Sequence, residues 1–303
     1  MSVSFPTNQF FPKEITLCPT NRCNLDCPHC CRGPLNRRLS LPAVLKFLDS
    51  FPQIEATRIN FSGGEPFLAL DFLCRVTSFA ADRDSGQGVI VTNAAWFSSR
   101  RGLADALSRL SDSGYQGGFQ VSLDALHGNR SDKAAVFFEE VFRVWGPRAS
   151  IAFLRVKYGP DRLGDLRRYR NIPVHDIELV PVGKAASLKT PWQDDKWFIE
   201  DYCRGPGNIF FVAPGGEVRP CCGYALGQGL SLGNIYRDTP QKLIAKAFSN
   251  RFVYTVFSCG LAVIRDRLIK KGWFFPGKTS NHCLFCHYVL NTVPMRLLAQ
   301  VLD

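Results

Sequence analysis

Short apolar runs alternate with amphipathic stretches from Lys13 to Val180. Apolar, β-rich runs predict strands, and apolar residues three and four positions apart predict helices. Strands are expected at 13–19, 57–62, 88–92, 118–123, 149–156 and 174–180, and helices at 40–51, 68–81, 101–111 and 134–145. Such alternation builds an α/β fold with a parallel sheet and outer helices. Six units are too few for a closed eight-stranded barrel, so we expect a partial (β/α)6 barrel or an open doubly wound sheet.

The pattern changes after Pro191. Residues 209–221 predict a hairpin with its turn at Pro214-Gly215-Gly216, and helical stretches follow at about 239–249 and 252–271. We therefore expect two units, a barrel over residues 1–192 and a small hairpin-plus-helix domain over residues 193–303.

Apolar residues make up 46% of the chain and charged residues 21%, which is typical of a folded protein with a sizeable core. The net charge of +11 favours acidic partners: nucleic acid, a membrane surface, or an anionic substrate or peptide. No apolar run is long enough to cross a bilayer. The first dozen residues lack the basic and apolar regions of a signal peptide. We therefore expect a cytoplasmic protein.

The chain contains 12 cysteines, and spaced thiols in a reducing cytosol bind metal or do chemistry more often than they form disulfides. Cys23, Cys27 and Cys30 form a C-x3-C-x2-C pattern on a loop after a strand. Thiolates suit iron–sulfur clusters or zinc. Three ligands leave one iron of a [4Fe-4S] cluster open to a substrate or cofactor, whereas zinc would need His29 or Cys31 as a fourth ligand.

Three motifs in order resemble the radical S-adenosylmethionine (SAM) superfamily. They are the cysteine loop, Gly63-Gly64-Glu65 after the second expected strand, and Ser122-Leu123-Asp124 after the fourth. The resemblance covers residues 13–182 and implies that family's partial (β/α)6 barrel. Glycines without Cβ atoms let the backbone approach a ligand closely, and Glu65 or the adjacent carbonyls could accept a hydrogen bond from an ammonium.

The resemblance also implies a cofactor arrangement. A [4Fe-4S] cluster would sit on the three cysteines, with the amino and carboxylate groups of SAM on its fourth iron. One-electron reduction, by a donor such as flavodoxin or ferredoxin, would cleave SAM to methionine and a 5′-deoxyadenosyl radical. His29 takes the family's aromatic position beside the adenine. Asn93, Ser122 and Asp124, at or just after predicted strand ends, are the further residues expected to bind SAM.

A second cysteine set is similar to the twitch extension of radical SAM enzymes, the shortened relative of the SPASM domain. Cys203 and Cys221 follow a C-x12-G-x4-C pattern, and Cys283 and Cys286 close the set. The resemblance implies one auxiliary [4Fe-4S] cluster on these four thiols, hence two clusters per chain. A zinc knuckle on Cys283 and Cys286, completed by His282 or His287, is the alternative.

Four stretches resemble the epipeptide epimerases, which convert L-residues to D-residues in ribosomal peptides: 27–31, 61–67, 182–185 and 216–222. That resemblance implies that the adenosyl radical removes a Cα hydrogen and that Cys222 returns hydrogen to the opposite face. A thiol S–H bond is weaker than a peptide Cα–H bond, so the transfer runs downhill. Among the remaining cysteines, Cys18, Cys74 and Cys259 are expected to be buried apolar residues.

Other interpretations stay open at this point. One is a twitch-type dehydrogenase or epimerase of a sugar alcohol or aminoglycoside, and another is thioether formation on a peptide. A nucleic-acid module is a different class, but basic stretches such as 265–271 fall on predicted helices and no aromatic platform is evident. We expect a peptide substrate, no nucleic-acid partner and no membrane partner.

Overall fold

The structure is a computed structural model. It describes residues 11–31, 36–128, 130–147, 149–156, 169, 171–177, 179, 183–188, 192–198, 209–221 and 230–302. Two residues with expected roles, Cys203 and Cys222, lie outside the described residues.

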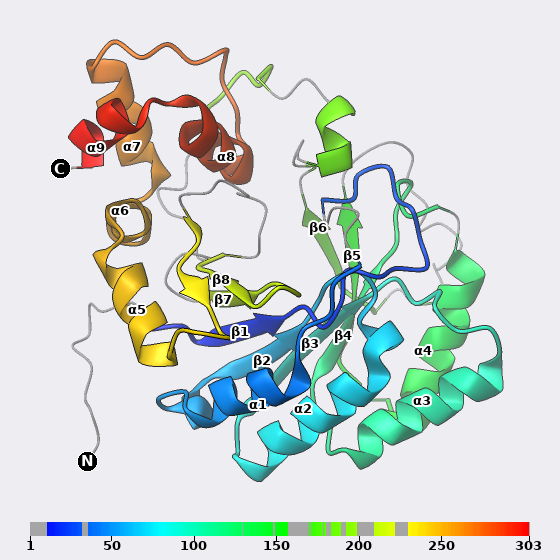
Figure 1. The fold of residues 1–303 in the computed structure, drawn as a ribbon. Helices are drawn as coiled ribbons and strands as arrows, with labels where there is room; N and C mark the ends of the chain where they lie inside the picture. Colours follow the sequence, from blue (N-terminus) through cyan, green and yellow to red (C-terminus); the bar gives the residue numbers. More distant parts are fainter. Residues whose placement is uncertain are drawn as a thin grey trace.

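Within this described part, nine strands form one sheet in the order β6-β5-β4-β3-β2-β1-β7-β8-β9 (Figure 1). The strands are β1 (Glu14–Leu17), β2 (Arg58–Phe61), β3 (Gly86–Thr92), β4 (Gly118–Ser122), β5 (Ile151–Val156), β6 (Val174–Ile177), β7 (Ile209–Val212), β8 (Glu217–Arg219) and β9 (Gly233–Asn234). Strands β1 to β6 pair in parallel, which confirms the six expected strands of a partial barrel.

Four helices cover one face of this sheet (Figure 1). They are α1 (Leu41–Asp49), α2 (Leu70–Asp82), α3 (Arg100–Asp112) and α4 (Ser131–Trp145). The expected N-cap is confirmed, because the Ser40 side chain accepts a hydrogen bond from the Ala43 N–H at the start of α1. The apolar stripe of α3 is buried as its spacing predicts: Leu103, Ala106, Leu107 and Leu110.

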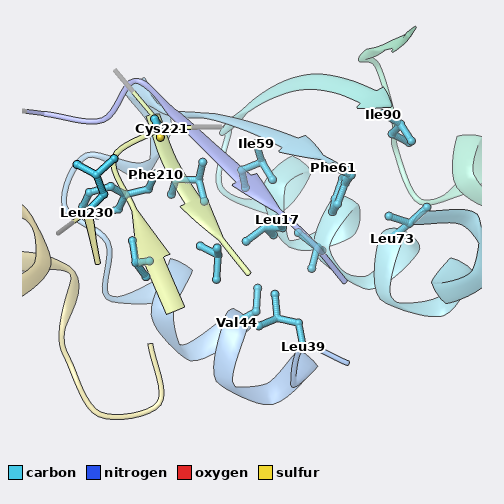
Figure 2. Packing of buried hydrophobic residues seen from close by; sticks show 14 of the residues in the cluster. Leu17, Leu39, Val44, Ile59, Phe61, Leu73, Ile90, Phe210, Cys221 and Leu230 are labelled. Carbon is cyan, nitrogen blue, oxygen red and sulfur yellow. The ribbon is translucent and has the colours of Figure 1, made fainter. Parts of the chain in front are cut away.

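The core lies between these helices and the sheet. Figure 2 shows Leu17 of β1, Ile59 of β2 and Phe210 of β7 in one apolar cluster, with Val44 of α1 close by. Successive side chains of a strand point to opposite faces. One face of the parallel strands therefore packs on α1–α4, and the other is left for a cavity.

The expected hairpin exists as β7 and β8, and it extends the barrel sheet. Strand β7 pairs in parallel with β1, with Ile15 opposite Phe210, and β8 returns antiparallel to β7. One sheet thus crosses the boundary expected at residue 192. The separate roles of the two sequence units remain a prediction.

The C-terminal helices stand beside the hairpin (Figure 1). They are α5 (Pro240–Ser249), α6 (Arg251–Cys259), α7 (Leu261–Lys270), α8 (His282–Thr292) and α9 (Met295–Leu302). The prediction of a single helix over 252–271 is wrong. The chain forms two helices there, α6 and α7, because the helix ends at Gly260, which has a φ of 85° and a ψ of 165°. The expected burial of Cys259 is wrong too, because the break leaves this residue exposed at the end of α6.

Among the described residues, no helix is both long and apolar enough to span a membrane.

Candidate active site

A cavity of about 510 Å³ lies on the sheet face opposite α1–α4. Strand side chains that line it include Thr16, Asn60, Val91 and Gln120, and they alternate with residues buried against the helices. The loop after β1 closes the cavity at the carboxyl ends of the strands, where α/β folds carry their functional groups.

The first cysteine cluster meets at this cavity. Cys23, Cys27 and Cys30 all line it, as the C-x3-C-x2-C pattern predicts for ligands of one group. Burial, followed by the charges of Cys23 and Cys30, raises the pKa of the Cys27 thiol to about 11. Three thiolates held this close therefore need a positively charged partner, so the donor set fits a metal cluster.

The described residues do not form a site for a single metal ion. Among the described residues, no three His, Cys, Asp or Glu side chains stand close enough to hold one ion. A [4Fe-4S] cluster takes each thiolate on a separate iron and spreads its ligands more widely than one ion does.

Gly63 and Gly64 pack against the backbone of the cysteine loop. A Cβ on Gly64 would come within 2.1 Å of the Arg22 carbonyl oxygen, and the Gly64 N–H donates to the Thr20 carbonyl at 2.9 Å. The sequence predicts glycines that make room for a ligand. In the structure, the absence of a Cβ atom also lets the backbone of the cysteine loop pack closely against the segment after β2.

Glu65 is buried away from the cavity. Its carboxylate accepts hydrogen bonds from the Phe67 N–H at 3.2 Å, the Thr92 hydroxyl at 2.9 Å and the Asn93 N–H at 2.8 Å. Burial raises the pKa of Glu65 to about 7 against the opposing effect of these donors. With three protein donors on its oxygens, Glu65 links the loop after β2 to the end of β3. Binding of an ammonium by the adjacent carbonyls stays a prediction.

Asn93 lines the cavity just after β3 and points to the cysteine loop. Its Nδ2 lies 3.5 Å from Cys23 Sγ and 2.9 Å from Asn24 Oδ1. Asn24 Nδ2 in turn donates to the Ala95 carbonyl at 3.0 Å. The two asparagines thus hold the loops after β1 and β3 together at the first cysteine.

Two histidines meet at the edge of the cavity. The rings of His29 and His127 pack edge-to-face with their centroids 4.5 Å apart, and both line the cavity. Burial, followed by the positive charge of His127, lowers the pKa of His29 to about 4. His29 Nδ1 is buried and has no hydrogen-bond partner among the described residues, so a neutral ring is available to a ligand there.

Asp124 positions His127. Its Oδ2 lies 2.9 Å from His127 Nδ1 and accepts the Val156 N–H at 3.0 Å. Burial opposes ionisation of Asp124, but the hydrogen bond and charge of His127 and the backbone donors together hold its pKa below the usual value. Asp124 is not among the residues that line the cavity, whereas Ser122 is.

A short helical turn, η4 (Gly183–Ser187), also contacts the cysteine loop and escaped prediction as a site element. The Lys184 N–H donates to the Cys30 carbonyl at 3.1 Å, and its ammonium forms an ion pair with Asp26. The resemblance over residues 182–185 marks this segment in the sequence, but not its contact. Cys31, next to the third cysteine, lines the cavity as well.

The structure describes three of the four residues expected to hold an auxiliary cluster. Cys283 and Cys286 lie one turn apart on α8, so their side chains share one face of that helix. Cys221 follows β8 and is buried in the apolar cluster that also contains Phe210 and Leu230 (Figure 2). The fourth, Cys203, is outside the described part, so the auxiliary site stays a prediction.

No family model matches this chain. Among curated proteins, the GTP 3′,8-cyclase of Listeria monocytogenes is 25% identical over 199 residues, which cover 59% of this chain and 57% of the cyclase. The matched region therefore spans less than two thirds of that protein. YydG of Bacillus subtilis, which is named for peptide biosynthesis, is 20% identical over 301 residues and 93% of each chain.

Solved structures show the same fold over nearly the whole chain. The anSMEcpe protein with bound AdoMet is 14% identical, with a TM-score of 0.58, covering 96% of this chain and 98% of that one. The same protein with bound AdoMet and the Cp18Cys peptide gives a TM-score of 0.56. The fold is thus the radical SAM partial barrel. In fold and sequence the chain resembles radical SAM enzymes, some of which carry twitch- or SPASM-type extensions.

Proposed function

We propose that this protein is a radical SAM enzyme that modifies a ribosomal peptide. The observation that carries the proposal is the meeting of Cys23, Cys27 and Cys30 at one cavity, on a fold shared with AdoMet-binding proteins. The full-length similarity to YydG and the fold shared with peptide-bound anSMEcpe support a peptide as the substrate.

Residues 1–192 would hold the SAM-binding cluster and residues 193–303 the auxiliary one. When bound, SAM and its cluster would supply a 5′-deoxyadenosyl radical that removes a hydrogen atom from the substrate. His29 and Ser122 line the cavity where SAM would lie. Glu65 and Asp124 act behind that surface, since each engages its carboxylate with protein donors.

We propose the finer reaction on the resemblance to epipeptide epimerases. The Cys222 thiol would donate its hydrogen atom to the planar Cα radical from the face opposite SAM, giving the D-residue and a thiyl radical. One electron and one proton would then restore the thiol. The electrons would come from a flavodoxin- or ferredoxin-type donor in the reducing cytoplasm.

The other candidate reactions use the same first step. A dehydrogenase of a sugar alcohol or aminoglycoside would remove two electrons from its substrate, and an epimerase of such a substrate would invert a carbon of the small molecule. A thioether-forming enzyme would join a cysteine sulfur to a peptide carbon. Only the peptide epimerase returns a hydrogen atom from a solvent-exchangeable thiol to the Cα of a peptide and leaves a D-residue there.

The test is an anaerobic reaction of the reconstituted enzyme in deuterated buffer, with any short ribosomal peptide found to be encoded beside its gene as the first substrate. We expect one D-residue that carries one deuterium at Cα, with 5′-deoxyadenosine formed alongside. A product two mass units lighter would show oxidation instead. A reconstituted wild-type protein that cannot cleave SAM would contradict the whole proposal.

A further inference from the structure

The three cysteines of the first cluster differ in their surroundings. Cys23 Sγ receives two N–H groups, from the Leu25 backbone at 3.4 Å and from Asn93 Nδ2 at 3.5 Å. Among the described residues, no donor reaches the sulfur of Cys27 or Cys30. One ligand of the three therefore has a hydrogen-bonded sulfur, and one of its donors comes from a different strand end.

The orientation of the Asn93 amide is fixed by its other contacts. Its Oδ1 accepts the Ala95 N–H at 2.8 Å, and an N–H facing that atom requires an oxygen there. Nδ2 must then face the cysteine loop, where one hydrogen meets Asn24 Oδ1 and the other is directed at Cys23 Sγ.

The backbone of Asn93 is equally constrained. Its N–H is held by the buried Glu65 carboxylate at 2.8 Å, and the next residue, Ala94, has a left-handed φ of 50°. A non-glycine residue adopts that conformation at a cost, which the surrounding contacts must offset. Holding the Asn93 side chain next to Cys23 therefore costs conformational free energy at Ala94.

We propose that Asn93 is a positioning residue that keeps an N–H on the Cys23 sulfur and so raises the reduction potential of the cluster bound by Cys23, Cys27 and Cys30. This rests on the proposed function. Hydrogen bonds to cluster sulfurs are a known control of potential. An N–H dipole stabilises negative charge on sulfur, and uptake of one electron from the external donor increases that charge. The reduced state therefore gains more than the oxidised state.

The test is a redox titration of the reconstituted protein, followed by electron paramagnetic resonance. The cluster that changes its spectrum on SAM addition is the one measured. Asn93→Asp keeps the acceptor for the Ala95 N–H and loses the donor to sulfur. Asn93→Leu loses the donor without adding a charge. Asn24→Ala is the matched control, because it removes a loop contact but leaves the donor to Cys23 in place.

We expect both Asn93 variants to titrate at a lower potential than the wild type, with the larger shift in Asn93→Asp because of its added charge. The Asn24→Ala potential should stay close to that of the wild type. Unchanged potentials in both Asn93 variants at full iron content would overturn the inference, as would an equal shift in Asn24→Ala. The iron content of the wild-type protein and its cleavage of SAM are measured separately from the potentials. A wild-type protein that binds no cluster or cleaves no SAM would contradict the proposed function, whereas unchanged potentials contradict only the role of Asn93.

Discussion

The carboxylate of Glu65, buried behind the cavity, accepts the backbone N–H of Asn93 at 2.8 Å. These residues belong to different strand ends, and Asn93 reaches the sulfur of Cys23 in turn. The Gly-Gly-Glu motif is thus linked to the cysteine loop twice, once through the glycine backbone and once through Glu65 and Asn93.

Glu65 should make folding stability depend on pH. Its pKa in the folded protein is about 7, against an ordinary value of 4.5. The folded state therefore holds the proton more tightly than the unfolded state. The stabilisation that the bound proton of Glu65 gives to the folded state is complete below pH 4.5 and is lost as the pH rises through about 7. By linkage, the free energy of unfolding should fall by up to about 3 kcal/mol across this range.

Glu65→Gln should remove that part of the pH dependence. The measurement is a series of anaerobic urea titrations of both proteins between about pH 5 and pH 8. Parallel pH profiles in the two proteins would show that Glu65 stays ionised throughout.

Gly64→Ala should disturb the cysteine loop itself. The added Cβ would stand 2.1 Å from the Arg22 carbonyl oxygen, so the loop must shift and its three thiols move with it. We expect the reconstituted variant to lose most of the iron of the first cluster, together with SAM binding. The control is Gly86→Ala, whose Cβ would lie 3.4 Å from its nearest neighbour, and it should load normally. Normal iron in Gly64→Ala would mean that the loop tolerates the shift.

Joint replacement of Cys23, Cys27 and Cys30 by Ala should leave about half of the iron of a two-cluster protein and abolish SAM cleavage. Cys74→Ala is a suitable control, because Cys74 lies on α2 and does not line the cavity. Iron and sulfide analysis measures the cluster content, and an assay of 5′-deoxyadenosine measures SAM cleavage. A triple variant that kept full iron would refute the assignment of the first cluster.

Cys222→Ala should still form 5′-deoxyadenosine with the true substrate, since abstraction precedes donation, but should yield no inverted residue. Cys31→Ala should keep inversion. Chiral amino-acid analysis of the peptide separates the two. Inverted product from Cys222→Ala would make Cys31 the next candidate, because it lines the cavity. Cys259 would be a poor choice, since it is exposed at the end of α6.

The alternating pattern of the sequence predicts the parallel strands and their helices because burial on one or both faces leaves a direct mark on it. It fails at Gly260, where apolar positions continue at helical spacing through the residue that ends α6. Local spacing cannot reveal a glycine that turns the chain.

The sequence also predicts which thiols meet at the cavity, since their spacing on one loop determines this. It does not predict what Gly64 touches or where Glu65 points. Gly64 meets the loop at Arg22, and Glu65 meets the strand end at Asn93, so both contacts join segments that are distant in the chain. Long-range neighbours of this kind leave no periodic signal in a single sequence.

Strand β1 has neighbours on both sides, β2 from nearby in the chain and β7 from beyond the expected domain boundary. During synthesis, one edge of β1 therefore stays unpaired until β7, which ends at Val212, has been made. A chain cut at the expected boundary of residue 192 would keep that edge open beside the buried Ile15 and Leu17. Unpaired strand edges recruit other chains. The second half of this protein therefore also covers a strand edge of the first half.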